Sequence, residues 1–218
     1  MDEFLLPGVV GRRRPQVYLI HSARPLCTLS SAVVGGGLRR VRYILNRHVA
    51  KGYRHPAPAG DLRAFARRQG IVGPFVGLLT AAYVQRAQVV RLQQGALQVS
   101  VVVTAGLSNA TAAGLTPPWS PSRVGTINTI VLVDARLTPA ALVNAALTAT
   151  EAKVATLLAR GTTTPYGPAT GTSTDALVIA CTGRDPTVPY AGPVTPVGWL
   201  IARGVRQALA AALEAQGW

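Results

Sequence analysis

The pattern of apolar and polar positions divides the chain into a β-rich first half and a second half in which strands alternate with helices. In the first half, short runs rich in β-branched residues lie between turn residues, a pattern typical of strands. A short helix is predicted over 61–69, whereas 73–83 fits either a buried helix or a strand. The predicted strands of the first half span 17–20, 26–34, 40–49, 84–92 and 97–104.

The second half contains one strand and two helices with well-defined starts. Residues 126–133 predict the strand. A helix is predicted over 138–160, because Thr138 suits the N-cap and the proline after it suits the first helical position. A closing helix over 195–216 begins with the same Thr-Pro pair. Together these elements predict an α+β fold, a mixed or two-layered β-sheet flanked by helices, in a single domain covering 1–218.

The predicted helix over 138–160 carries a polar segment, 148–153, on a largely apolar surface. At about 100° per residue, five apolar side chains form one stripe that we expect to be buried, with Thr150 inside it. Glu151 and Lys153 lie on opposite shoulders of the stripe, where each charge needs a partner or ligand, or else stays solvated at the edge. The stripe consists of Val143, Leu147, Val154, Leu157 and Leu158.

Composition indicates an ordered protein without a membrane span. Of 218 residues, 49% are hydrophobic and 14% are charged, which excludes wholesale disorder. No run reaches the roughly 20 apolar residues of a transmembrane helix. The opening residues carry acids and a proline where a signal peptide needs basic and apolar regions, so a cytoplasmic location is expected. There, Cys27 and Cys181 are expected to be reduced thiols.

The net charge of +14 is concentrated in the first half of the chain. Through Arg91 there are fifteen Lys and Arg residues against three acids, and after it seven against five. A basic half invites a nucleic-acid interpretation. The arginines are scattered, however, with few aromatic residues between them and without a nucleic-acid-binding motif. We therefore expect no nucleic-acid partner.

The segment 169–175 concentrates hydroxyls around one glycine and one carboxylate, directly before the apolar run 176–181. Loops at strand ends commonly carry binding and catalytic groups. The same residue types are also ordinary turn formers that bond their own backbone, so both interpretations stand. The candidate residues of this loop are Thr170, Gly171, Thr172, Thr174 and Asp175.

The sequence predicts no metal site. Its three histidines, His21, His48 and His55, do not form an HExxH pattern, and neither cysteine belongs to a CxxC pair. Solvated loop positions account for the histidines more simply than a ligand set does.

Further polar clusters lie at the ends of predicted strands, and together with the two polar segments above they carry a family resemblance. The chain resembles the adenosylcobinamide amidohydrolase (CbiZ) family over roughly 29–213. Residues before about 16 form an N-terminal extension that is not matched, nor is the proline-rich loop near Trp119. The matching segments are 30–31 with 35–37, 104–110, 125–128, 148–153 and 169–176.

The resemblance implies a corrinoid-salvage enzyme. The family hydrolyses the amide that joins the aminopropanol arm of adenosylcobinamide to the corrin ring, and releases adenosylcobyric acid. The corrinoid is then the small-molecule substrate and no resident cofactor is expected. The alternative is a corrinoid-binding or transfer protein that cuts no bond, since apolar walls and a few polar loops can hold a large flat ligand. The oligomeric state is open, and a homo-oligomer is compatible with the sequence.

Amide hydrolysis needs a nucleophile, a base and donors for the oxyanion. We expect water activated by Glu151 or Asp175. Lys153, Asn109, Asn128 or the loop amides near Gly171 would stabilise the oxyanion. The competing route is covalent attack by a Ser or Thr hydroxyl, namely Ser31, Thr126, Thr172 or Thr174. The residues expected to contact the substrate are Ser30, Ser31, Gly36, Thr104, Ser108, Asn109, Thr126, Asn128, Thr150, Thr170, Gly171, Thr172 and Thr174.

Overall fold

One nine-stranded mixed sheet, folded over on itself, forms the centre of the molecule. The computed structural model describes residues 2–118 and 125–218. The strand order is β1-β2-β3-β14-β9-β7-β6, and β4 pairs with both β3 and β5. All neighbours are antiparallel except β4 with β5 and β9 with β14. The strands are β1 (Asp2–Leu6), β2 (Val9–Arg14), β3 (Val17–Ser30), β4 (Gly37–His48), β5 (Phe75–Thr80), β6 (Gln88–Gln94), β7 (Leu97–Gly106), β9 (Thr126–Val133) and β14 (Ala176–Cys181).

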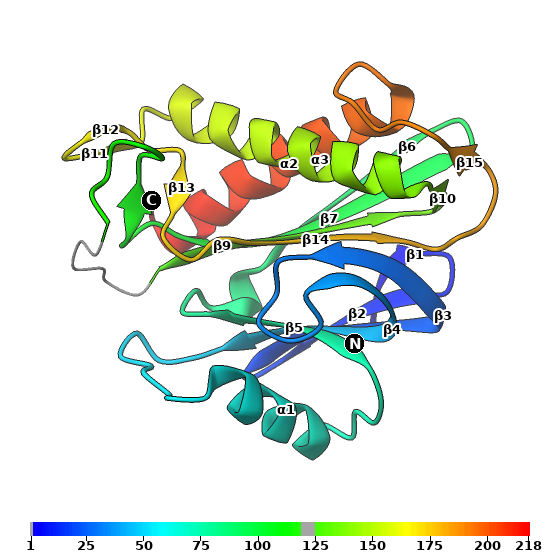
Figure 1. Ribbon diagram of the computed structural model, residues 1–218, viewed down its shortest axis with the longest axis horizontal. Helices are drawn as coiled ribbons and strands as arrows, with labels where there is room; N and C mark the ends of the chain where they lie inside the picture. The colour runs from blue at the N-terminus through cyan, green and yellow to red at the C-terminus, as the bar shows by residue number, and fades with distance from the viewer. Residues whose placement is uncertain (1, 119–124) are drawn as a thin grey trace.

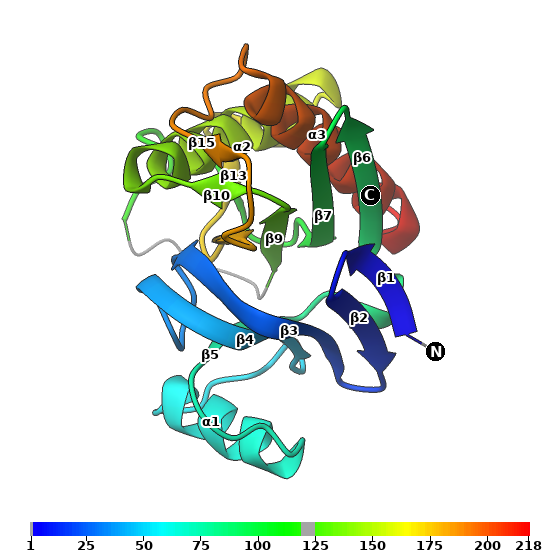
Figure 2. The same cartoon turned by 90° about the vertical axis from the view of Figure 1, so that its right-hand side faces the viewer.

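Three helices cover the outer faces of the folded sheet. In Figure 1 and Figure 2, α2 (Pro139–Ala159) and α3 (Pro196–Gln216) lie over β14, β9, β7 and β6. The shorter α1 (Pro58–Arg68) lies on the opposite side, against β3, β4 and β5. The layers therefore run helix, sheet, sheet, helix, which confirms the predicted α+β fold with a two-layered mixed sheet.

The two halves of the sheet enclose an apolar core between them. Strand alternation directs Ile130 and Leu132 of β9 into this core, while Val131 faces the helices. Leu5 and Leu6 of β1, both 1% exposed, belong to the same core. The hairpin of β1 and β2 is thus an integral part of the sheet.

Three two-stranded ribbons and one 3-10 turn complete the secondary structure of residues 2–118 and 125–218. The antiparallel ribbon of β8 (Ala110–Thr111) and β13 (Gly171–Thr172) ties the hydroxyl-rich loop 169–175, here called the polar loop, to the segment after β7. The other elements are β10 (Arg136–Leu137) with β15 (Thr187–Val188), β11 (Thr163–Thr164) with β12 (Gly167–Pro168), and η1 (Val84–Arg86).

The second half of the chain folds as its local signals predict. The predicted strand over 126–133 is β9. The side chain of Thr138 accepts a hydrogen bond from the Ala141 backbone at 3.1 Å and so caps α2. Thr195 caps α3 in the same way. Both helix starts are confirmed, because a side-chain acceptor satisfies a backbone donor that has no partner inside the helix.

The first half differs from its predictions in several boundaries. The strands predicted over 17–20 and 26–34 belong to one long strand, β3, which ends at Ser30. The ambiguous segment 73–83 contains β5, a buried strand. In the strand predicted over 84–92, the first three residues form the turn η1, because Val84 is buried at the start of a tight connection into β6. The predicted short helix begins earlier, at Pro58.

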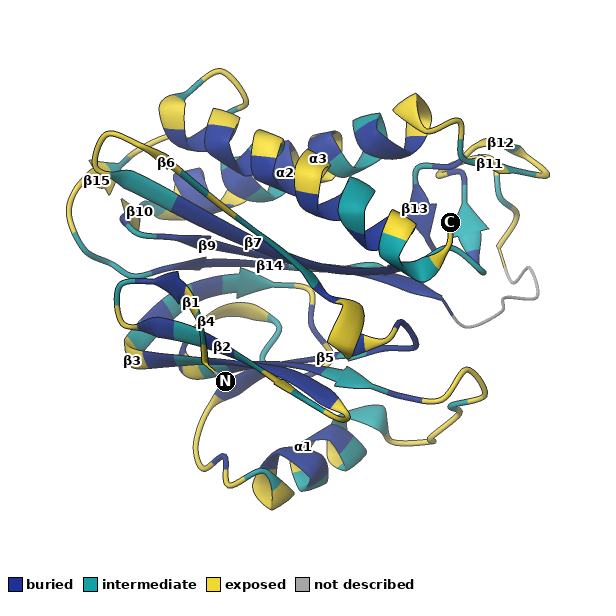
Figure 3. Cartoon of the chain, turned by 180° about the vertical axis from the view of Figure 1, so that it is seen from behind, coloured by how far each residue is buried: buried dark blue, intermediate teal, exposed yellow. Residues whose placement is uncertain are grey.

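The predicted buried stripe of α2 is wrong in its orientation. Val143, Leu147 and Leu158 are 52%, 56% and 48% exposed, whereas β7, β9 and β14 of the sheet are largely buried (Figure 3). The helix buries mainly small residues, which allow close contact with α3 and the sheet. Apolar residues surround the whole helix, so periodicity alone could not identify the buried face. Even so, no helix in the described ranges is long and apolar enough to cross a membrane.

Two glycines at the third position of a helix give a matched test of packing. A Cβ on Gly198 of α3 would overlap the Gly192 carbonyl oxygen and lie 2.7 Å from that of Ala191. A Cβ on Gly60 of α1 would have its nearest neighbour at 3.8 Å. We expect Gly198→Ala to lower the free energy of unfolding by about 1–3 kcal/mol, since backbone must shift to admit the methyl group. Gly60→Ala should raise it by up to about 1 kcal/mol through helix propensity. Urea denaturation measures both, and equal effects would contradict the packing of α3.

Candidate active site

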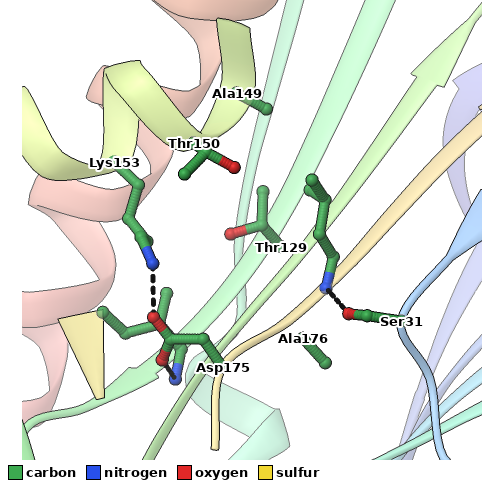
Figure 4. A pocket seen from close by; sticks show the side chains of 9 residues that line it. Ser31, Thr129, Ala149, Thr150, Lys153, Asp175 and Ala176 are labelled. Carbon is green, nitrogen blue, oxygen red and sulfur yellow. Dashed lines mark hydrogen bonds and ion pairs between the residues drawn. The ribbon is translucent and has the colours of Figure 1, made fainter. Parts of the chain in front are cut away.

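Asp175 lies where the polar loop meets β14, and its carboxylate joins three parts of the chain. Its Oδ2 accepts a hydrogen bond from Nζ of Lys153 on α2 at 2.6 Å (Figure 4). Its Oδ1 accepts from the backbone N–H of Ile127 on β9 at 3.1 Å and from the hydroxyl of Thr172. Both charged side chains are 17% exposed, so solvent screens this ion pair less than it screens a surface pair.

The parallel pairing of β9 and β14 explains why these groups meet. Ala176 is in register with Asn128, so the two strands begin at the same edge of the sheet. Asp175, the residue that precedes β14, therefore lies beside Ile127 at the start of β9. The nearby end of α2 contributes Lys153 from above (Figure 4).

Gly171 allows the loop to approach this ion pair closely. A Cβ at this position would overlap Oδ2 of Asp175 and lie 2.7 Å from Nζ of Lys153. Glycine is needed here for space, since any side chain would push the loop away from the charges.

Two threonine hydroxyls form a relay between β9 and the loop. The hydroxyl of Thr174 donates to the carbonyl oxygen of Gly125 at 2.6 Å, and it is also hydrogen-bonded to the hydroxyl of Thr126. The Thr174 hydroxyl has one proton and donates it to that carbonyl, so it can only accept in its bond with Thr126. Thr126 is therefore the donor in the hydrogen bond between the two hydroxyls. Asn109 Nδ2 supports the relay by donating to Oγ of Thr174 at 3.3 Å and to Oγ of Ser173 at 2.7 Å.

A cluster of buried polar side chains lies between the two sheet layers near the same edge. Asn128 Nδ2 donates to Oδ1 of Asn46 at 2.8 Å and to the carbonyl of Leu79 at 2.9 Å. Asn46 in turn donates to the hydroxyl of Thr104 at 2.8 Å. Oδ1 of Asn128 and Oδ1 of Asn109 are buried and accept no hydrogen bond within the described part of the chain. Buried acceptors of this kind are costly unless a ligand or another group uses them.

A pocket of about 300 Å³ opens beside the ion pair. Its walls come from the starts of β9 and β14, from α2 and from the turn after β3 (Figure 4). Apolar groups predominate. Among the polar ones, Lys153 pairs with Asp175, whereas Oγ of Ser31 accepts a hydrogen bond from the Leu177 backbone at 3.0 Å. The lining residues are Ser31, Ile127, Thr129, Ala149, Thr150, Lys153, Asp175, Ala176 and Leu177.

The structure brings many of the predicted site residues to this edge. Gly171, Thr172, Thr174, Asp175 and Lys153 surround the carboxylate, with Thr126 and Asn109 in the hydroxyl relay and Ser108 beside Gly125. Ser31 and Thr150 line the pocket, and Thr104 and Asn128 belong to the buried cluster.

Other predicted residues lie outside the pocket. Glu151 is exposed on α2 and does not line it. Ser30 accepts from the backbone of Ala32, and Gly36 lies in the turn that follows. The hydroxyl of Thr170 accepts from the backbone of Ala113, and so holds the loop to its neighbour.

Sequence reasoning missed Asn46 and Thr129. The signal for Asn46 was an amide side chain inside the apolar run of β4, where a buried polar group needs a specific partner. Burial also raises the pKa of the Cys181 thiol, which is 1% exposed and so unsuited to act as a nucleophile. Among the described residues, no three His, Cys, Asp or Glu side chains form a group that could hold a metal ion.

The sequence of this chain is similar to those of proteins from one known family. A family model described as adenosylcobinamide amidohydrolase matches residues 7–218. An adenosylcobinamide amidohydrolase of Methanosarcina mazei is 35% identical over 196 residues, which are 86% of this chain and 90% of the relative. One of Halobacterium salinarum is 38% identical over 145 residues, or 64% of this chain and 58% of that protein. Among solved structures, a Burkholderia beta-aminopeptidase superposes with a TM-score of 0.51 at 18% identity, covering 93% of this chain and 79% of its own. That last likeness concerns the fold alone.

The ion pair between Lys153 and Asp175 is expected to stabilise the fold measurably. A double-mutant cycle with Lys153→Met and Asp175→Asn should give a coupling energy of about 1–2 kcal/mol, because both groups are partly desolvated and hydrogen-bonded. The matched control is Arg160 with Glu214, whose side chains are 29% and 67% exposed, and which should couple by no more than about 0.5 kcal/mol. Urea denaturation of the four proteins in each cycle provides the values. Equal coupling in the two pairs would contradict a special role for Asp175.

Proposed function

Because the chain belongs to the adenosylcobinamide amidohydrolase family, we propose that it hydrolyses the amide between the aminopropanol arm and the corrin ring of adenosylcobinamide, releasing adenosylcobyric acid. The observation that carries this proposal is the convergence of an ion pair, a hydroxyl relay and a pocket at one edge of the sheet. The corrinoid is the substrate, and the reaction requires no resident cofactor.

The pocket suits the arm of the substrate better than its ring. Its volume of about 300 Å³ is at the lower end of the range for small-molecule sites, roughly 300–1,000 Å³. The aminopropanol group would enter the pocket and leave the scissile amide at its rim, toward Thr126, which lies outside the lining, while the macrocycle stays outside. Thr150 lines the pocket on the same helix as Val143 and Leu147, whose exposed apolar side chains offer a surface for the ring.

Attack by the hydroxyl of Thr126 accounts for the geometry better than attack by water activated by a carboxylate. Both oxygens of Asp175 already accept hydrogen bonds, and one is paired with Lys153, so this carboxylate is poorly placed to take a proton. Glu151 is exposed on α2 and belongs neither to the pocket lining nor to the hydrogen-bonded group of Thr126, Thr174 and Asp175. The hydroxyl of Thr126, in contrast, donates to the hydroxyl of Thr174, which can take its proton and pass one on to the nitrogen of the leaving amine.

The remaining groups then have supporting roles. Asp175 fixes the loop that carries Thr174, and Lys153 supplies positive charge at the pocket for the developing oxyanion. Water hydrolyses the ester formed on Thr126 and regenerates the hydroxyl. The amine leaves as aminopropanol.

A corrinoid-binding or transfer protein is the second candidate function. It would need the apolar stripe and the pocket, but it would give no reason for a hydroxyl relay and a partly buried ion pair at the same edge. Cytoplasmic location, a homo-oligomeric state and the lack of a nucleic-acid partner stay predictions from the sequence.

Incubation of the purified protein with adenosylcobinamide distinguishes the two functions. We expect stoichiometric release of aminopropanol and adenosylcobyric acid, measured by liquid chromatography with mass spectrometry. Thr126→Val should lower kcat by about 10²–10⁴-fold, and Asp175→Asn by about 10²-fold. Tight corrinoid binding without release of aminopropanol would rule out the hydrolase.

Two carboxylate variants serve as controls in the same assay. Glu214→Gln changes an exposed carboxylate that is not part of the pocket lining and should leave kcat unchanged. Glu151→Gln separates the two mechanisms. If its loss equals that of Asp175→Asn while Thr126→Val stays active, Glu151 is the base and Thr126 is not the nucleophile.

A further inference from the structure

The peptide bond between Gly125 and Thr126 lies beside two hydroxyl groups that are hydrogen-bonded to each other. The carbonyl oxygen of Gly125 accepts a hydrogen bond from the hydroxyl of Thr174 at 2.6 Å. That same hydroxyl is bonded to the hydroxyl of Thr126, the residue on the other side of the peptide bond. A nucleophilic hydroxyl and the carbonyl next to it in the chain are thus joined through one intervening hydroxyl. An ordinary strand start needs no such arrangement.

The surroundings hold both sides of this bond in place. A Cβ on Gly125 would overlap Oδ1 of Asn109 and lie 2.8 Å from the Gly106 carbonyl oxygen and 2.9 Å from Oγ of Ser108. Thr126 is 5% exposed and begins β9, which is paired on both sides. The Oδ1 atom of Asn109, buried and without a donor among the described residues, lies at the same point. Fixed geometry of this kind lowers the entropic cost of an intramolecular reaction.

We propose that the chain cleaves its own backbone between Gly125 and Thr126, and that Thr126 then acts as an N-terminal nucleophile. The hydroxyl oxygen of Thr126 attacks the carbonyl carbon of Gly125. The Thr126 proton passes to Oγ of Thr174, whose own proton passes to the Gly125 carbonyl oxygen. The five-membered intermediate collapses when the bond between that carbon and the Thr126 nitrogen breaks. The nitrogen takes the proton from the former carbonyl oxygen, which leaves Gly125 joined to the Thr126 side chain as an ester. Water then hydrolyses the ester, leaving a carboxylate on Gly125 and a free hydroxyl and α-amine on Thr126.

This step deepens the proposed function, on which its catalytic meaning rests. A free α-amine has a pKa of about 7.7–8.0 and can serve as the general base for its own hydroxyl near neutral pH. Departure of Gly125 also vacates the place that its carbonyl occupies beside Thr174. The substrate amide carbonyl would take that place, with the same hydroxyl as donor. The uncleaved chain, in which Thr126 is 5% exposed, would then be a precursor.

Intact-mass spectrometry of the purified protein over time tests the cleavage directly. We expect two fragments, 1–125 and 126–218, and N-terminal sequencing of the second fragment should begin at Thr126. The same dipeptide occurs at Gly161-Thr162 and Gly171-Thr172, and these bonds should stay intact. A chain that stays whole, or one cut at either of those bonds instead, would overturn the proposal.

Variants separate self-cleavage from a contaminating protease and from misfolding. Thr126→Val should stay whole and Thr126→Ser should be cut, while Thr174→Val should slow cleavage by roughly 100-fold. Thr156→Val is the matched control, since Thr156 is also 5% exposed but donates within α2, and its cleavage rate should not change. The rate should be independent of protein concentration. A rate that rises with concentration, or cleavage of Thr126→Val, would contradict the proposal.

The two proposals can fail separately. Cleavage at Thr126 without release of aminopropanol would contradict the hydrolase proposal and support the self-cleavage proposal. Release of aminopropanol by a chain that stays whole would keep the hydrolase function and remove the self-cleavage.

Discussion

The candidate site depends on the hydrogen bonds that the Asp175 carboxylate accepts. It accepts hydrogen bonds from Lys153 on a helix, from the Ile127 backbone on a strand and from Thr172 in its own loop. These donors fix the loop against β9, and the fixed loop in turn places Thr174 beside Thr126. A partly buried carboxylate with three donors is stable only as a unit, because loss of one partner leaves the others with unmet charge or hydrogen bonds.

The folded sheet supplies the groups that lie around this carboxylate, mainly from the start of β9. Successive residues of β9 point to opposite faces, so Ile127 and Thr129 line the pocket under α2 while Asn128 joins the polar cluster between the layers. Thr126 begins the same strand and meets the loop at its edge. One strand start therefore supplies a pocket wall, a buried amide and the hydroxyl that we propose as the nucleophile. The antiparallel neighbour β7 pairs with β9 from Thr126 onward, and the parallel neighbour β14 pairs with it from Asn128 onward.

Local signals in the sequence predicted the parts of the fold that depend on local chemistry. Thr138 and Thr195 mark the helix starts, since capping involves residues three apart. The buried face of α2 could not be predicted, because Val143 and Leu147 are as apolar as the residues that α3 and the sheet cover. Likewise, the polar loop and the helix segment 148–153 stood out by composition, but only the tertiary fold shows that Lys153 meets Asp175. Asn46 was missed because its partners come from strands far away in sequence.

The most direct measurement of the central claim is the identity of the group that carries the acyl intermediate. The protein is mixed with adenosylcobinamide, quenched in acid during the first turnover, digested and analysed by mass spectrometry. The account predicts a corrinoid ester on the peptide that contains Thr126. An ester on Ser31, Thr172 or Thr174 would contradict it, as would a complete first turnover in which no peptide carries the corrinoid at any time point.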